Sequence, residues 1–251
     1  MRLFTILTLF AYGWVAQIQA QSEPELVRAE FRVLPILTAD WTGILYQPAP
    51  GEPMVELEFR SLARSFGTYK YEGPDPLRFY RETGTTTEGE PVYTEVGRVP
   101  VSSSEMLVFF MKQASGDDPD APEFSLLAMN DSPDGLPMDH IAFVNFMEIP
   151  FRCRFMDENF ILEPGIGEPV SLRDHLNEDV FVGLVVQNND THRVVLRNNW
   201  EFRPGNRHLI LLLPQKKAGS FRIRAYRVTD FVGENERFNR NWSPPVLSRN
   251  D

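Results

Sequence analysis

Apolar and polar residues alternate one by one along much of this chain, and this period-two pattern constrains the fold more than any other feature. Ala29, Phe31 and Val33 alternate with charged neighbours, and similar patterns recur at 55–59 and 221–225. Successive side chains of an extended strand point to opposite faces, so each segment predicts a strand with one buried side and one solvent-facing side. No segment shows helical spacing of apolar residues for more than two turns.

Two further segments, 106–111 and 209–213, are apolar at almost every position. A strand that is covered on both faces needs apolar side chains throughout, so both segments are expected to be central strands. Many short strands separated by Gly, Pro, Asn and Asp predict an all-β protein, built as a sandwich or a barrel. Further strands are expected near 77–81, 92–99, 124–129, 140–147, 180–187 and 192–198.

The two apolar segments also anchor a weak internal repeat. Residues 99–110 correspond to residues 202–213 at an offset of 103, and each segment leads through a polar loop into another strand. That strand begins at Phe124 or Phe221, which makes the first loop six residues longer. The repeat predicts two tandem β-sandwich domains, with one larger sandwich as the alternative.

The start of the chain resembles a targeting segment rather than part of the fold. Arg2 is followed by the apolar segment 3–15, and the small residue Ala20 precedes Gln21. This layout predicts a secretory signal peptide that is too short for a stable membrane span, although an uncleaved signal acting as an anchor is an alternative. We therefore expect a periplasmic or secreted protein.

These patterns divide the chain into four expected parts. The sequence of residues 30–33 in the first expected domain is similar to that of residues 142–145 in the second. The short linker within 130–139 contains two prolines, which should limit how the domains are oriented. The expected parts are a signal peptide (1–20), an acidic β-sandwich domain (22–131), a second β-sandwich domain (132–230) and an irregular C-terminal tail (231–251).

The charge of the chain argues against nucleic acid as a partner. Without Arg2, 24 Lys and Arg stand against 35 Asp and Glu, a net charge near −11. Residues 22–131 carry 9 basic and 19 acidic residues, whereas residues 132–230 carry 12 and 13, so the acidity lies in the first domain. Phosphate binding needs a basic surface, which this composition does not predict.

The single cysteine excludes an internal disulfide. Cys153 alternates with Arg152 and Arg154 and shares a predicted strand face with Phe151 and Phe155. We therefore interpret it as a small buried hydrophobic residue rather than a reactive thiol.

A nine-residue segment and the predicted strand that follows it resemble those of other proteins. Residues 127–135 read Leu-Ala-Met-Asn-Asp-Ser-Pro-Asp-Gly and precede the predicted strand 141–145. This pattern resembles uncharacterised exported bacterial proteins with tandem immunoglobulin-like, Greek-key β-sandwich domains, over most of the mature chain. The resemblance implies a fold and no activity, and the paired cysteines and central tryptophan of antibody domains are absent.

Residues that could carry catalysis are present but are not grouped along the sequence. The histidines His140, His175, His192 and His208 all lie more than five residues apart, so there is no compact zinc motif. His192 and His208 adjoin arginines and are expected to be solvated. Neither a Gly-x-Ser-x-Gly motif nor a glycine-rich phosphate loop is present. A site assembled from distant residues stays open, but we predict no catalytic, cofactor-binding or metal-binding residues.

Two acidic segments could bind calcium, which favours several carboxylate oxygens in one loop. The first contains Asp117, Asp118 and Asp120, and the second is the 130–139 linker. The strand predicted between them would hold them roughly 20 Å apart at about 3.3 Å per residue, so they cannot share one ion. Asp, Pro and Gly are also ordinary turn residues, and this is their expected role.

Carbohydrate chemistry has two candidate features. Glu56 and Glu58 lie two residues apart and could form a carboxylate pair, although a solvent-facing strand is the expected explanation. Trp41 lies in a loop-like segment and could be an exposed platform for a sugar ring, although burial under the loop is expected.

The sequence therefore favours a non-catalytic exported binding or structural module, whose partner is an unknown protein or polysaccharide. One alternative is a carbohydrate-binding or polysaccharide-processing accessory protein, which a row of exposed aromatic side chains would favour. The other is an enzyme with a site at the domain junction, which a deep cleft with converging histidine and carboxylate groups would favour.

Overall fold

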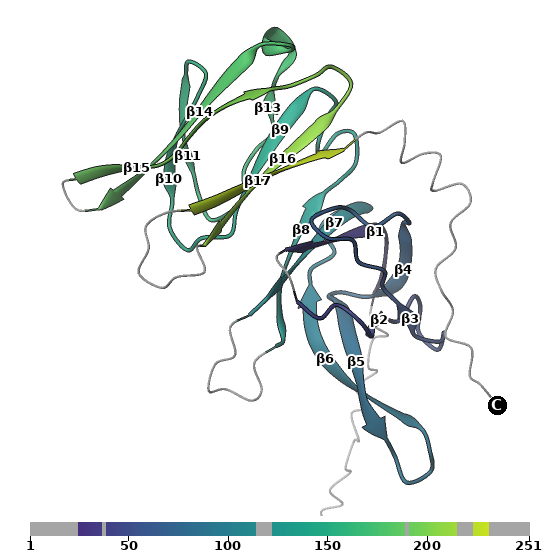
Figure 1. Ribbon diagram of the computed structural model, residues 1–251. Coiled ribbons are helices and arrows are strands. Elements are labelled where there is room, and N and C mark those ends of the chain that lie inside the picture. Colours follow the sequence, from purple (N-terminus) through teal and green to yellow (C-terminus); the bar gives the residue numbers. More distant parts are fainter. Residues whose placement is uncertain (1–24, 37–38, 114–121, 189–190, 215–222, 231–251) are drawn as a thin grey trace, which may run out of the picture.

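The computed structural model describes residues 25–36, 39–113, 122–188, 191–214 and 223–230, and these residues are almost entirely β-structure (Figure 1). The elements are β1 (Leu26–Ile36), β2 (Ile44–Tyr46), β3 (Val55–Glu56), β4 (Tyr69–Pro74), β5 (Leu77–Thr85), β6 (Pro91–Val99), β7 (Glu105–Lys112), β8 (Phe124–Asn130), β9 (His140–Asn145), β10 (Phe151–Phe155), β11 (Glu158–Leu162), β12 (Gly165–Ile166), β13 (Val170–Ser171), the 3-10 helix η1 (Arg173–His175), β14 (Asp179–Asn188), β15 (Thr191–Glu201), β16 (Arg207–Pro214) and β17 (Ile223–Asp230).

Four sheets form, two from each half of the chain, and we divide the halves after Asp131. The first half contains the N-outer sheet (order β3-β2-β5-β6) and the N-inner sheet (order β4-β1-β7-β8). The second half contains the C-inner sheet (order β12-β9-β16-β17, with β13 also on β9) and the C-outer sheet (order β11-β10-β14-β15). The expected all-β, sandwich-like fold is confirmed.

The alternating segments form strands because one side of each enters a core. Phe31 and Val33 of β1 pack between the two sheets of the first half, together with Met106, Val108 and Phe110 of β7. The second half is built the same way, and its core contains Phe143, Cys153 and other alternating residues. The burial predicted for Cys153 is confirmed, and burial raises the pKa of its thiol to about 12.

The continuous apolar segments are explained by a third core between the two inner sheets. Leu107 and Phe109 of β7 face away from the first core and pack in this layer with Leu209, Leu211 and Leu213 of β16. β7 and β16 are therefore covered on both faces, as predicted. Figure 1 shows the second half, coloured from teal through green to yellow, beside the β1, β7 and β8 strands of the first.

The two halves share one strand topology. In each half the first strand pairs in parallel with the second-to-last strand, as β1 with β7 and β9 with β16. The repeat is therefore real at the level of strands. Its residue alignment was wrong, however, because an offset of 103 places Met106 of the first core opposite Leu209 of the third core. An offset of 102 aligns the ends of both strands and the faces of their side chains.

One predicted strand is longer than the strand in the structure, and several other predictions concern residues outside its described part. The strand predicted at 55–59 is limited to Val55–Glu56. The signal peptide (1–20), the tail (231–251) and Asp117, Asp118 and Asp120 lie outside the described residues. Whether 22–131 and 132–230 fold as separate domains stays a prediction. No helix in the described part of the chain is long and apolar enough to cross a bilayer.

Candidate functional site

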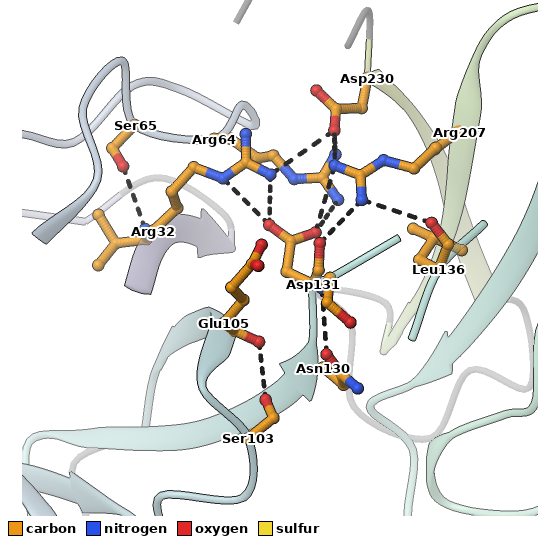
Figure 2. Close-up of polar contacts among 12 residues, drawn as sticks. Arg32, Arg64, Ser65, Ser103, Glu105, Asn130, Asp131, Leu136, Arg207 and Asp230 are labelled. Carbon is orange, nitrogen blue, oxygen red and sulfur yellow. Dashed lines mark hydrogen bonds and ion pairs between the residues drawn. The ribbon is translucent and has the colours of Figure 1, made fainter. Parts of the chain in front are cut away.

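Five charged residues from both halves meet beside the third core, and we call them the junction cluster (Figure 2). The cluster consists of Arg32 from β1, Arg64 from the loop before β4, Asp131 after β8, Arg207 at the start of β16 and Asp230 at the end of β17. Their side chains are at most 12% exposed. Three guanidinium groups and two carboxylates are therefore withdrawn from solvent together.

Asp131 is the centre of this cluster. One of its carboxylate oxygens accepts hydrogen bonds from Nε of Arg32 at 3.0 Å and from its Nη2, and the other accepts from Nη2 of Arg64 at 2.9 Å. Its main-chain carbonyl accepts a 2.8 Å bond from Nη1 of Arg207. Asp230 completes the cluster by pairing with Nη1 of Arg64 at 2.9 Å and with Nη2 of Arg207.

The charges in the junction cluster determine the protonation of Asp131. Burial by itself raises the pKa of a carboxyl group, but Arg64, Arg32 and Arg207 outweigh it and hold the pKa of Asp131 below its usual value. Desolvation lowers the pKa of Arg64, against the attraction of Asp131 and Asp230. Removing one partner from such a buried set leaves uncompensated charge, so each member of the cluster is needed where the two halves meet.

Sequence reasoning missed the junction cluster. Arg32 occupied a polar position of an alternating strand, and Asp131 was placed in a turn-rich linker. These two residues are 99 positions apart in the chain. Only the pairing of β1 with β7, and of β7 with β8, brings them together.

The linker residues do not gather around a common point. Asp131 is engaged by arginines, Asp139 accepts the main-chain N–H of Gly205 at 2.6 Å, and Asn130 accepts that of Ser132 at 3.1 Å. These are turn and pairing roles. In the part of the chain that is described, no group of three or more His, Cys, Asp or Glu side chains is placed to hold a metal ion.

The candidate carbohydrate residues in the first half have local structural partners. Oε1 of Glu56 accepts the N–H of Gly43 at 2.8 Å, so this carboxylate closes a loop. Trp41 is half-buried, and its ring stacks on Phe59 and Phe124 with centroid distances of 5.3 Å each. Trp41 therefore packs against the first core, as its expected burial predicted.

The prediction that His208 is solvated was wrong, because this residue is only 3% exposed. Its Nδ1 lies 3.2 Å from Oγ1 of Thr229, and its ring packs edge-on to Phe202. Desolvation, together with nearby Arg227, lowers the pKa of His208 to about 4. The ring is therefore neutral at physiological pH. His192, in contrast, is exposed.

The exposed face of the C-outer sheet carries a groove of about 680 Å³, which we call the arginine groove. One cross-strand row of its floor is largely apolar and consists of Ile161, Arg152, Val185 and Val194. Ile161 is 53% exposed and Val194 is 61% exposed, which is unusual for side chains of this kind.

The adjacent row of the groove places a glycine between two arginines. Its members, in order across the sheet, are Asn159, Arg154, Gly183 and Arg197. A Cβ at Gly183 would lie 3.0 Å from the ring of Phe181, so that ring lies across the glycine on the sheet face. The guanidinium of Arg197 is 5.9 Å from the centroid of the same ring.

The electrostatics of the arginine groove differ from those of the chain as a whole. Three arginines and His192 contribute to its described lining, and no carboxylate does. The carboxylate of Asp157, which is fully exposed, lies 3.9 Å from Arg154. The groove is thus a positively charged, partly apolar surface on a chain of net charge −10.

Comparison with known proteins adds no relative. No protein-family model matches the chain, and no curated protein matches it either.

Proposed function

We propose that this protein is a non-catalytic exported binding module, which engages its partner through the arginine groove. The observation that carries the proposal is the groove itself: arginines over exposed apolar side chains, with no carboxylate in the described lining. Exposed apolar area rimmed by charge is typical of a surface that is covered by a partner.

The junction supports a scaffold role for the rest of the molecule. The third core and the junction cluster fill the space where an enzyme site between domains was considered. The charged groups that converge there are paired and withdrawn from solvent, and a substrate could not reach them without separating the halves. The groove, in contrast, is open and lies on paired strands, with a register shift between Leu184 and Val185. Side chains on strands are positioned more precisely than those on loops.

Binding through the groove can be tested with two matched variants. The purified protein is mixed with insoluble envelope polysaccharide and with solubilised envelope proteins, and co-sedimentation is measured. Val194→Asp should abolish binding, whereas Arg28→Glu, at the exposed start of β1, should retain it. Equal binding by both variants, or release of soluble products from the polysaccharide by the wild-type protein, would contradict the proposal.

Export has a separate test. Mass spectrometry of the protein from the producing cell should find a mature start at Gln21. A full-length chain that stays in the membrane fraction would contradict export as a soluble protein.

A further inference from the structure

The arginine groove combines two recognition elements within one small area. Arg154 and Arg197 lie on either side of β14, so their backbones are about 10 Å apart at the usual strand spacing of about 4.8 Å. Gly183 between them contributes no side chain, and the space above it holds the flat ring of Phe181. A ligand at this ring would meet the guanidinium of Arg197, 5.9 Å from the ring centroid, and that of Arg154, whose Nε donates to the Met156 carbonyl at 3.2 Å.

Each element selects a different part of a ligand. An aromatic face stacks on the apolar face of a ring such as a sugar. A guanidinium presents parallel N–H donors that match a carboxylate, and such charge-assisted hydrogen bonds are strong. The neighbouring row adds Val185 and Val194, which extend the apolar floor beyond a single ring.

From this arrangement we propose that the arginine groove binds a carboxylated polysaccharide, with one uronate ring on Phe181 and its carboxylate between Arg154 and Arg197. This inference rests on the proposed function and names its ligand class. Charge complementarity supports it, because a surface lined by arginines attracts a polyanion even though the chain as a whole is acidic. An acidic peptide would satisfy the arginines but has no rigid ring face for Phe181.

The experiment measures binding of oligogalacturonate by calorimetry at low ionic strength. The comparison ligands are its fully methyl-esterified form, which has the same rings without charge, and an oligo-aspartate of equal charge. The protein variants are Phe181→Ala, the double variant Arg154→Gln with Arg197→Gln, and the control Arg28→Gln. Circular dichroism establishes that each variant is folded.

We expect the wild-type protein to bind oligogalacturonate at least tenfold more tightly than either comparison ligand. The double variant should lose at least tenfold in affinity, Phe181→Ala several-fold, and Arg28→Gln nothing measurable. Added salt should weaken the binding, because the arginines are exposed to solvent.

Three results would overturn the inference. Equal binding of the methyl ester would make the groove a neutral-sugar site, and equal binding of oligo-aspartate would make it a general polyanion or acidic-peptide site. In both cases the groove still binds a ligand, so the proposed function survives. No binding of oligogalacturonate at millimolar concentration would also refute the uronate inference, and the co-sedimentation test would then decide the proposed function independently.

Discussion

Arginines gather at two places in this protein, and the two places use them in opposite ways. In the junction cluster, Arg32, Arg64 and Arg207 are buried and held by two aspartates. In the arginine groove, Arg154 and Arg197 are exposed; no carboxylate belongs to the described lining, and the nearby carboxylate of Asp157, 3.9 Å from Arg154, is itself fully exposed. Buried arginines must keep their carboxylate partners, because an unpaired buried charge is costly to the fold, whereas arginines exposed to solvent can still bind a ligand.

This difference cannot be recognised from the arginines alone. Arg32 and Arg154 both occupy polar positions of alternating strands. What separates them is the sheet face on which they lie: the N-inner sheet is covered by the second half, and the C-outer sheet is open. The arrangement of layers therefore decides which charges are structural.

The strongest test of the junction removes its central acceptor. Asp131→Asn should destabilise the protein by about 3–5 kcal/mol, because three buried guanidinium groups lose their shared carboxylate. Chemical denaturation measures the loss. Glu72→Gln breaks the solvent-exposed pair with Arg28 and should cost far less. Equal effects of the two substitutions would mean that the cluster is not a tie between the halves.

The contribution of Asp131 to stability should decrease in acid. The pKa of Asp131 is lowered on folding, so its stabilisation is complete above the ordinary aspartate value of about 3.9. That stabilisation is lost as the pH falls through the lower folded-state pKa. Melting curves from pH 6 to pH 2 should therefore show a steeper acid loss for the wild-type protein than for Asp131→Asn.

The third core should be almost as sensitive as the junction cluster. Leu211 is fully buried between the inner sheets, and Leu211→Ala should cost about 2–5 kcal/mol through lost burial and a residual cavity. Val194→Ala truncates an exposed aliphatic side chain of the groove and should change stability by less than about 0.5 kcal/mol. If the two substitutions cost the same by chemical denaturation, the inner sheets do not share a core.

The titration of His208 should have a weaker effect on stability, in a different pH range. Its pKa falls from about 6.5 in the unfolded chain to about 4 in the folded protein. As pH falls from 6.5 towards 4, the unfolded state takes up a proton that the folded state does not, so stability decreases. His208→Asn, which does not titrate, should remove this decrease from the melting temperatures measured across that range. An unchanged pH profile would show that the ring is not kept neutral by burial.

The smallest expected effect belongs to the groove. Arg197→Ala removes an exposed charge near the Phe181 ring and should change stability by less than about 0.5 kcal/mol. Binding of oligogalacturonate should nevertheless decrease, so that affinity and stability separate at this residue. A destabilised Arg197→Ala variant would instead assign this arginine to the fold, alongside those of the junction.

Much of the fold could be predicted because period-two alternation is a local property. The central positions of β7 and β16 followed from their continuous apolar sequence. The burial of His208 could also have been found, since it shares a strand face with Ile210 and Leu212, but its arginine neighbour suggested solvent. The repeat was aligned one residue out of phase, because continuous apolar segments carry no signal of which side faces which core.

The candidate sites could not be predicted in the same way. The junction cluster depends on pairings between distant strands, and the arginine groove depends on cross-strand neighbours such as Arg154, Gly183 and Arg197. Each residue of the groove is ordinary at its own position. Only the register of three strands places the glycine between the arginines and gives the Phe181 ring room to lie flat.

The parallel pairing of β1 with β7 has a consequence for how the chain folds. Phe31 is the register partner of Met106, and Ile141 is that of His208, so each half closes on a strand synthesised long after its partner. Such non-local contacts slow folding, since a long loop must be ordered before they form. Synthesis starts at the N-terminus, so one edge of β1 stays unpaired until most of the first half has been made. During that interval its apolar residues are open to misassembly, which makes this a chain expected to depend on a holding chaperone.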